Sequence, residues 1–164
     1  MTATRIELLQ QMPIFGAVRN DALALLLQAQ RSREVAAGDY FFRERDPAQS
    51  MFVLEVGRAS VLKQWQGREL ALHRLGPGDC FGEMALLDLF PRSAAVRALD
   101  ECLAIELTPA DLLRLFERDS EQFALVQMNI AREMCRRLRA TDEMLFAATM
   151  GGSDAAPGTN FQVL

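Results

Sequence analysis

The sequence is poor in the residues from which metal centres, catalytic sites and disulfide scaffolds are built. It has one histidine and three cysteines in 164 residues. The cysteines, Cys80, Cys102 and Cys135, are odd in number and lack the paired spacing of a metal site. A metal-dependent enzyme on a β-barrel needs several histidines or carboxylates that converge, and His73 stands alone. We therefore assign no catalytic residue, no metal ligand and no cofactor, and expect a protein that is not an enzyme.

Long apolar runs and an excess of positive charge are also missing. Charged residues interrupt every hydrophobic segment before it reaches the roughly 18 residues of a membrane span. Residues 1–10 show neither the charged nor the apolar region of a secretory signal. The 18 lysines and arginines against 22 acidic residues give a net charge of -4, which opposes binding to a phosphate backbone. These features favour a soluble cytoplasmic protein with free thiols and no direct contact with DNA or a membrane.

The middle of the chain, about residues 32–107, has the pattern of a compact antiparallel β structure. Short β-rich runs are separated by turn residues at Gly38, Gly57, Gly67 and 77–79. Regular spacing of this kind is typical of a jelly-roll-like β-roll rather than of a parallel sheet. The expected strands are 40–43, 51–56, 60–65, 69–75, 93–98 and 102–107.

Helical patterns precede this roll. Apolar residues recur at helical spacing between Arg5 and Met12 and stop at Pro13. A second helix is expected to begin with Asn20 as its N-cap and to end near Gln30. The fold class is therefore mainly β with flanking helices.

Two more helices are expected after the roll. Thr108-Pro109 followed by Asp111 is typical of a capped helix start. From about 120 to 149 neither proline nor glycine interrupts the chain, which predicts a helix roughly 40 Å long. Residues 151–164 contain helix breakers and no periodicity, so we expect a flexible tail behind a single domain of residues 1–150.

Two sets of residues on the long helix bear on partners. Six residues recur at spacings of three and four, and they are Ala131, Met134, Leu138, Thr141, Leu145 and Ala148. This spacing predicts a homodimer with the helix as its seam, and simple packing on the roll is the alternative. The arginines of the same helix are Arg132, Arg136, Arg137 and Arg139. We expect them to form a solvated face or to pair with Glu133 and Glu143.

The most informative stretch, residues 77–96, has the features of an anion site. A helix N-terminus after a tight glycine offers backbone N–H groups to an anion, and Gly82 lets a ligand approach without a Cβ in the way. Arg92 supplies a planar cation whose donor fork suits phosphate oxygens. Ionised Glu83 only accepts hydrogen bonds, so beside a phosphate it requires hydroxyl donors such as those of a ribose. We call residues 81–96 the cassette.

The cassette resembles the phosphate-binding cassette of the cyclic-nucleotide-binding domain family. The resemblance rests on Phe-Gly-Glu-Met-Ala-Leu-Leu from Phe81, then four residues, then Arg-Ser-Ala-Ala-Val from Arg92. The family includes bacterial catabolite activators, regulatory subunits of cyclic-AMP-dependent kinase and cyclic-nucleotide-gated channels. The resemblance covers roughly residues 13–148, and the family's glycines between strands match Gly38, Gly57 and Gly78.

This resemblance implies a set of ligand contacts. Gly82 and Glu83 are expected to bind the ribose 2'-hydroxyl, and Arg92 the cyclic phosphate. Met84 lies among these residues, and the backbone amides of Ala85, Ser93 and Ala94 are expected to face the phosphate. Apolar strand residues enclose the base in the family, and the offsets match Val61 and Leu72 to this role.

The identity of the base is left open between two nucleotides. The long helix of catabolite activators ends near the purine, and Thr141 matches their threonine, while Asp142 replaces their usual serine. Both a hydroxyl and a carboxylate accept from the adenine amino group, so cyclic AMP is the expected ligand. A carboxylate also accepts two donors from guanine, and Ser93 is placed to contact a guanine in the syn form. Cyclic GMP is therefore the alternative, and a cyclic dinucleotide is not excluded.

The resemblance implies a ligand-gated regulatory module. Bound nucleotide would bias the position of the long helix, and a separate, unidentified effector protein would read that change. Catabolite activators use a helix-turn-helix domain that follows the long helix, whereas only about 15 residues follow it here, which disfavours direct control of transcription. A dimeric interaction domain that binds no nucleotide is the competing interpretation.

Overall fold

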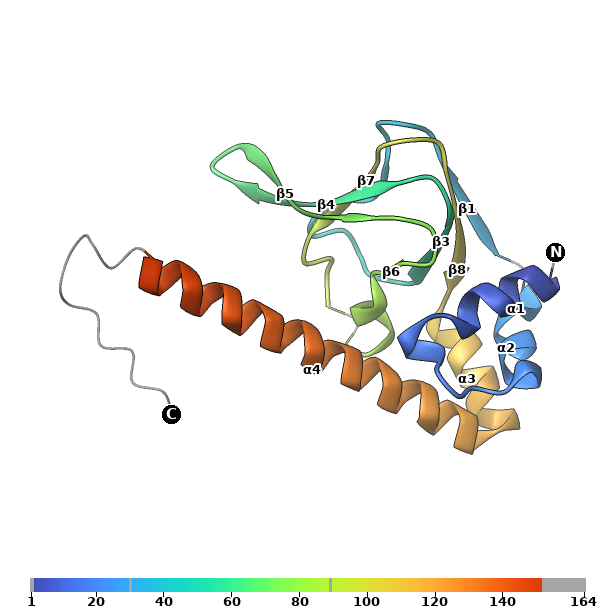
Figure 1. Ribbon diagram of the computed structural model, residues 1–164. Helices are drawn as coiled ribbons and strands as arrows, with labels where there is room; N and C mark the ends of the chain where they lie inside the picture. The colour runs from blue at the N-terminus through green and yellow to red at the C-terminus, as the bar shows by residue number, and fades with distance from the viewer. Residues whose placement is uncertain (1, 30, 89, 152–164) are drawn as a thin grey trace.

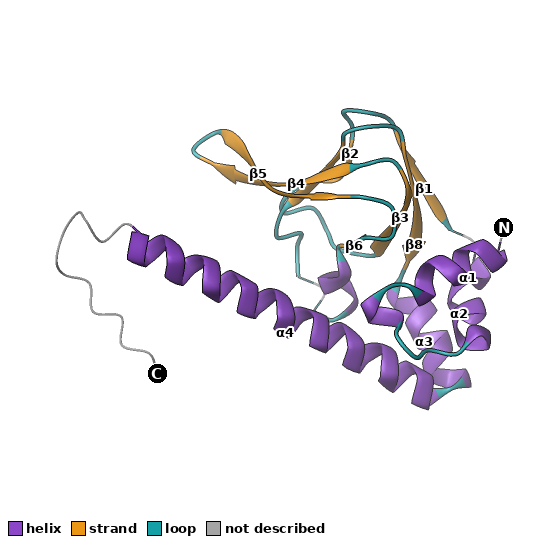
Figure 2. Ribbon diagram, viewed as in Figure 1, coloured by secondary structure: helices purple, strands orange, loops and turns teal. Residues whose placement is uncertain are grey.

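The computed structural model describes residues 2–29, 31–88 and 90–151 (Figure 1). Helices gather at one end of a β-roll, and one long helix runs from that end past the roll (Figure 2). The helices are α1 (Thr2–Gln10), η1 (Pro13–Phe15), α2 (Asn20–Leu26), η2 (Leu27–Ala29), η3 (Glu83–Leu86), α3 (Pro109–Arg118) and α4 (Ser120–Gly151). The strands are β1 (Ser32–Val35), β2 (Tyr40–Phe42), β3 (Met51–Val56), β4 (Ala59–Trp65), β5 (Arg68–Leu75), β6 (Cys80–Phe81), β7 (Ala95–Ala98) and β8 (Cys102–Leu107).

The strands form two four-stranded sheets in which every pair is antiparallel. Their orders are β1-β8-β3-β6 and β2-β7-β4-β5. The predicted β-roll with N-terminal helices and a long C-terminal helix is confirmed. Strands β3 and β8 have the predicted limits, whereas β1 and β6 were not predicted. Strand β1 is short and largely exposed, and β6 has two residues, so neither leaves a periodic hydrophobic pattern.

Two buried clusters hold these layers together. One lies between the helices and the β1-β8-β3-β6 sheet, where Leu23, Met51 and Ile130 are almost fully buried. The other fills the roll and includes Phe41, Phe52 and Phe81. Rings of Phe52 and Phe81 stack with centroids 5.4 Å apart, within the usual range for aromatic pairs. The cassette is thus attached to the core through its first residue, Phe81.

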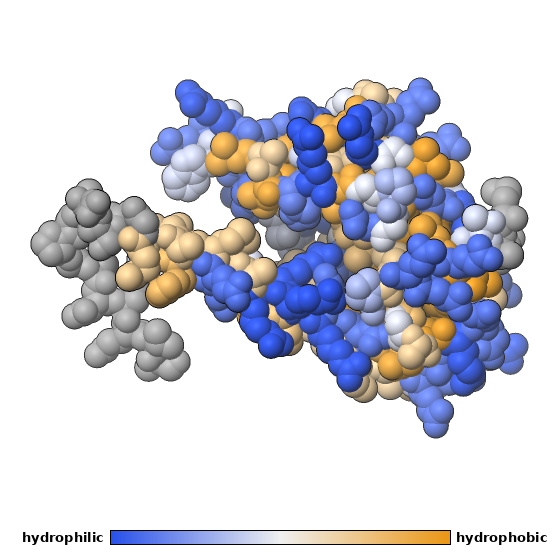
Figure 3. Space-filling view, viewed as in Figure 1, coloured by the Kyte–Doolittle hydropathy of each residue, from blue (hydrophilic) through white to orange (hydrophobic). Residues whose placement is uncertain are grey.

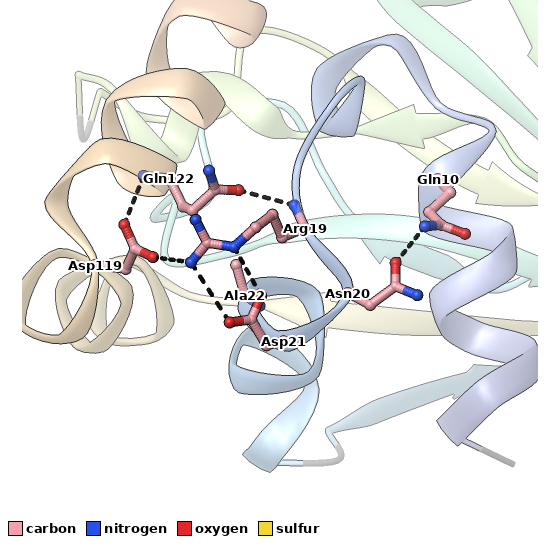
Figure 4. Close-up of polar contacts among 7 residues, drawn as sticks. All are labelled: Gln10, Arg19, Asn20, Asp21, Ala22, Asp119 and Gln122. Carbon is pink, nitrogen blue, oxygen red and sulfur yellow. Dashed lines mark hydrogen bonds and ion pairs between the residues drawn. The ribbon is translucent and has the colours of Figure 1, made fainter.

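The N-terminal helices are joined to the root of α4 by polar contacts (Figure 4). The backbone N–H of Arg19 donates to Gln122 Oε1 at 2.8 Å, and its guanidinium pairs with Asp21 and Asp119. About two turns further along α4, Asn129 Nδ2 donates to the Gly16 carbonyl at 2.8 Å. The start of α4 is therefore fixed to the N-terminal segment.

The second helix begins at Asn20, as expected, but Asn20 is not its N-cap. The N-cap of α2 is Arg19, which makes no side-chain capping bond, and Asn20 is already helical. The Asn20 amide oxygen instead accepts a hydrogen bond from Gln10 (Figure 4). The expected cap of α3 is confirmed, because Thr108 and Asp111 form a reciprocal capping box.

Helix α4 confirms the predicted long helix, and its second half is exposed to solvent. Residues 135–150 are all exposed, including Leu138, Leu145 and Phe146. Of the six predicted seam residues only Met134 is partly buried, against the helical cluster. Packing of this face on the roll is therefore wrong for the other five. The predicted tail lies outside the described residues apart from Gly151, which ends α4.

Candidate functional site

A hollow of about 240 Å³ opens between the cassette, the β4–β5 hairpin and the middle of α4. We call it the cassette pocket. It is lined by Phe42, Ala48, Val61, Leu72, His73, Cys80, Phe81, Gly82, Glu83, Met84, Ala85, Asp88, Phe90, Pro91, Arg92, Ser93, Ala94, Val96 and Arg137. All seven residues expected to hold phosphate and ribose line this pocket, and so do both strand residues expected at the base. Their ligand contacts stay predictions.

Arg92 is buried at the inner end of the pocket, with 7% of its surface exposed. Its Nη2 donates to the Ser50 carbonyl at 2.7 Å, and its Nη1 donates to the Gly82 carbonyl at 3.2 Å. The guanidinium carbon lies 3.9 Å from the centroid of the Phe42 ring, a cation–π contact. Its Nε has no hydrogen-bond partner within the described residues.

The electrostatic setting of Arg92 suits an anion. Burial lowers the pKa of its guanidinium, and the nearby carboxylates of Asp46, Glu106 and Glu83 act against that effect. Its hydrogen bonds nevertheless go to neutral carbonyls, and no carboxylate of the described residues bonds to it directly. A buried cation normally has a bonded counter-charge, because desolvation of an unpaired charge is costly. A phosphate would supply that charge together with acceptors for the donor fork.

Gly82 is required by the backbone and by Arg92 at once. It is the N-cap of η3 and has φ 73°, the left-handed conformation that side chains rarely adopt. A Cβ added here would lie 2.5 Å from Arg92 Nη1 and 3.3 Å from the Ser50 oxygen. The glycine therefore leaves the space that the arginine occupies.

Glu83 is buried and bonded to α4. Its Oε1 accepts a hydrogen bond from Arg137 Nη1 at 2.5 Å, while its Oε2 has no partner in the described part of the chain. Burial alone would lower the pKa of Arg137, but the carboxylates of Glu83 and Glu133 leave it raised. Arg137 also pairs with Glu133 as expected, with its Nε 3.0 Å from Oε1. Its contact with the cassette was not expected.

The residues expected to offer backbone amides to the phosphate make contacts of their own in the cassette. Ala85 donates its N–H to the Gly82 carbonyl at 3.1 Å, so this amide is engaged within the 3-10 turn. The Ser93 carbonyl accepts from Lys63 Nζ at 2.5 Å, and the Ser93 hydroxyl lies 4.0 Å from the Met84 sulfur. Ser93 and Ala94 line the pocket directly after Arg92.

The outer part of the pocket is mostly apolar and is formed by β4, β5 and β6. Val61 and Leu72 lie on the hairpin, and Phe90 of the cassette borders the opening with 70% of its surface exposed. Cys80 fills a buried position on β6. Burial raises the pKa of its thiol to about 12, so it is not a reactive thiolate near neutral pH.

The two residues expected to cap the base do not line this pocket. Thr141 and Asp142 are exposed on the second half of α4, and the Thr141 hydroxyl donates to the Arg137 carbonyl at 2.9 Å. The structure therefore does not bring them together with the cassette. Their proposed contact with the base stays a prediction that requires α4 to move or a second copy of the chain.

Several lining residues were not assigned from the sequence. Phe42 supports Arg92, and Arg137 reaches the cassette from 54 residues away. His73 lies beside Leu72 on the pocket wall, although we expected only a strand position there. Hydrophobic periodicity indicates that His73 lies on a strand. It does not show which strand pairs with that segment, so the place of His73 in the pocket could not be predicted. No group of three or more histidines, cysteines or carboxylates suited to a metal occurs among the described residues.

Comparison of the sequence with known proteins identifies the family of this chain. Residues 32–119 match the family model described as the cyclic nucleotide-binding domain. The "Cyclic AMP receptor protein" of Thermus thermophilus is 32% identical over 131 residues, which are 79% of this chain and 59% of that protein. A cAMP-dependent protein kinase regulatory subunit of Emericella nidulans is 33% identical over 99 residues, covering 60% of this chain and 24% of that protein.

The fold comparison agrees. The crystal structure of the Thermus thermophilus catabolite activator protein matches with a TM-score of 0.74 at 31% identity, over 84% of this chain and 63% of that one. The chain thus spans less than two thirds of these regulators. No helix of the described residues is long and apolar enough to cross a membrane.

Proposed function

We propose that this chain, which belongs to the cyclic nucleotide-binding domain family, is a regulatory module that binds cyclic AMP in the cassette pocket and signals through α4. The observation that carries the proposal is Arg92, a buried cation with no directly bonded carboxylate among the described residues, at the inner end of a pocket with room for a ligand. Binding and regulation need no chemical step, and we assign no catalytic residue.

Two charged groups of the cassette bind different parts of the nucleotide. Arg92 binds the cyclic phosphate through its donor fork, and its unpartnered Nε gives a further donor. Glu83 accepts from the ribose hydroxyl, for which its Oε2 is available. Gly82 provides the close approach of the backbone. The hydroxyl satisfies a buried carboxylate oxygen that otherwise costs stability, so ribose recognition and the stability of the cassette are coupled.

Signalling follows from the bond between Arg137 and Glu83. The carboxylate that binds ribose in this proposal is also the one that holds α4 against the cassette. A ligand that changes the hydrogen bonds of Glu83 therefore changes the free energy of that contact. The shift of α4 is limited to the difference in ligand affinity between its two positions.

The preference for cyclic AMP over cyclic GMP is supported by the named relatives, a cyclic AMP receptor and a cAMP-dependent kinase subunit. Val61 and Leu72 enclose the purine without distinguishing the two bases, since both are apolar. Discrimination then rests on polar groups, Ser93 in the cassette and Thr141 with Asp142 on α4. The last two act only if α4 or a second copy brings them to the pocket.

The exposed second half of α4 supports a homodimer. Figure 3 shows hydrophobic residues gathered at the far end of this helix, and Met144, Leu145 and Phe146 there are each about two-thirds exposed. Burial of such residues in a two-helix seam removes apolar surface from water. The module, residues 1–150, would then act in the cytoplasm on an effector protein through α4.

Calorimetric titration with cyclic AMP, cyclic GMP and a cyclic dinucleotide tests the proposal. We expect micromolar binding of cyclic AMP, about -8 kcal/mol, and its loss in Arg92→Ala. Arg97→Ala is the matched control, because Arg97 is on β7 but does not line the pocket. Asp142→Ser should weaken cyclic GMP alone if it contacts guanine. An absence of heat with all three ligands, together with an intact dimer, would favour the non-binding interaction domain.

A further inference from the structure

The cassette pocket includes one imidazole, that of His73, on the wall formed by the β4–β5 hairpin. Val61 pairs with His73, but the next residue of β4, Leu62, pairs with Ala71, which leaves Leu72 as an extra residue in β5. Successive residues of a regular strand point to opposite faces, and a bulge re-aims them. Here both Leu72 and His73 line the pocket. His73 thus faces the pocket through its pairing with Val61, and the bulge adds Leu72 beside it. The imidazole is the polar, titratable group of a wall that is otherwise apolar.

The imidazole lies among charges contributed by three segments. Arg137 comes from α4, Glu83 from η3, and Asp79 from the turn before β6. The partner in β4 is the apolar Val61. His73 lies in an exposed stretch of β5. Its partial burial against the pocket wall and the charge of Arg137 lower the pKa of its imidazole from the ordinary value of 6.5, while Asp79 and Glu83 act against this. This lowered pKa favours the neutral imidazole at neutral pH.

Resting on the proposed function, we propose that His73 is a ligand-responsive residue of the cassette pocket, which takes a proton from solvent when an anionic cyclic nucleotide binds. The ligand adds one negative charge to a pocket in which the cation Arg137 is shared between two carboxylates. Protonation makes both ring nitrogens donors, so the imidazolium is able to bond to acceptors on the nucleotide. Ligand affinity then increases on acidification.

The direction of this pH dependence follows from the coupling between proton binding and ligand binding. If the ligand raises the pKa of His73, the complex holds more protons than the empty protein between the two values, and lower pH favours the complex. A rise of one unit gives at most about a tenfold gain in affinity. The gain appears as the pH falls through the pKa of the complex and is complete below that of the empty protein. The cyclic phosphodiester stays anionic throughout this range.

The pKa of His73 can be measured directly, because the chain has one histidine. In protein without a histidine tag, the imidazole NMR signals belong to His73 alone and report its pKa with and without cyclic AMP. Calorimetry at pH 8 and pH 5.5, in buffers of different ionisation enthalpy, gives the affinity and the protons taken up. His73→Gln removes the titration, and His73→Lys keeps a positive charge at both pH values. Arg74→Gln is the matched control, since its neighbour Arg74 does not line the pocket.

We expect the His73 signals to shift to a higher pKa with cyclic AMP, a several-fold gain in affinity at pH 5.5 with net proton uptake, and loss of both gain and uptake in His73→Gln and His73→Lys. Arg74→Gln should retain them. Binding with an unshifted His73 titration, or with the same pH dependence in His73→Gln, would overturn this inference and leave the proposed function intact. No binding at either pH would overturn the proposed function itself.

Discussion

Arg137 and Glu83 form the one ion pair within the described residues that joins α4 to the cassette, with 2.5 Å between Nη1 and Oε1. The two partners differ in exposure, because the Glu83 side chain is 5% exposed and that of Arg137 is 42% exposed. Removal of the arginine therefore leaves a buried carboxylate without its cation. Removal of the glutamate leaves an arginine that water and Glu133 are able to satisfy.

Arg137→Ala should accordingly destabilise the protein by about 1–2 kcal/mol, less than loss of a fully buried pair because the arginine is partly exposed. The adjacent Arg136 also pairs with Glu133 but not with Glu83, so Arg136→Ala is the control and should change stability little. Urea unfolding measures both. The double variant Glu83→Gln/Arg137→Ala should recover part of the loss, and equal losses in the two single arginine variants would contradict the structural role of the cassette contact.

A second prediction separates the conformation of Gly82 from its contact with Arg92. Gly82→Ala imposes a side chain at positive φ and places a Cβ against Arg92 Nη1. Gly38 also has a positive φ, 88°, yet a Cβ there meets nothing within 4 Å. Both alanine variants should lose about 1–2 kcal/mol of stability from the backbone.

Only Gly82→Ala should also abolish cyclic AMP binding, because Arg92 must leave its position. Thermal unfolding and calorimetric titration of both variants measure the two effects. If Gly82→Ala binds cyclic AMP as Gly38→Ala does, Arg92 does not bind the phosphate from the position seen here.

The grouping of the cassette residues around one pocket was predictable because the sequence signals for it are local. Gly82, Glu83 and Arg92 lie within eleven residues, and their types alone indicate an anion next to a hydroxyl donor. The limits of β3 and β8 were also predictable, since buried central strands carry continuous hydrophobic runs. The capping box of α3 is likewise contained in four residues.

The rest of the site depends on contacts between distant segments. Arg137 is part of an arginine cluster on a helix, and only the path of α4 past the cassette selects it rather than Arg136. His73 lies on the pocket wall because its strand partner is Val61, and this pairing is not readable from residue types. Asn20 has the composition of an N-cap, yet a tertiary hydrogen bond from Gln10 engages its side chain. Local propensity was overruled there by packing between helices.

Another prediction concerns the assembly of two chains through the second half of α4. Leu145 is 65% exposed and belongs to the expected seam, whereas Arg139 is exposed on the same helix outside it. Leu145→Glu should shift the protein to monomers, because a charge in the seam opposes burial of its apolar surface. Arg139→Glu, which also introduces a glutamate, should leave the assembly unchanged. Sedimentation velocity of the three proteins measures this, and a monomeric parent protein would refute the proposed dimer.

The last prediction concerns acid stability at the start of α3. The Asp111 carboxylate is buried and accepts from the Thr108 N–H at 2.7 Å, the Thr108 hydroxyl at 2.8 Å, and the guanidinium groups of Arg31 and Arg114. Burial, the largest single influence, raises its pKa, but the hydrogen bonds from Thr108, Arg31 and Arg114 outweigh it and leave the pKa lowered from 3.8.

A lowered pKa in the folded state means that ionised Asp111 stabilises the protein above pH 3.8 and that this contribution is lost as the pH falls through the folded value. Asp111→Asn should therefore cost about 2–3 kcal/mol at pH 7, where it removes a charge held by several hydrogen bonds, and progressively less below pH 3.8. Urea unfolding between pH 7 and pH 3 measures the difference. Asp100→Asn is the control, because Asp100 pairs with Arg58 on the surface and solvent screens that pair. A constant difference between Asp111→Asn and the parent protein across this range would show that the aspartate acts through its shape and not through its charge.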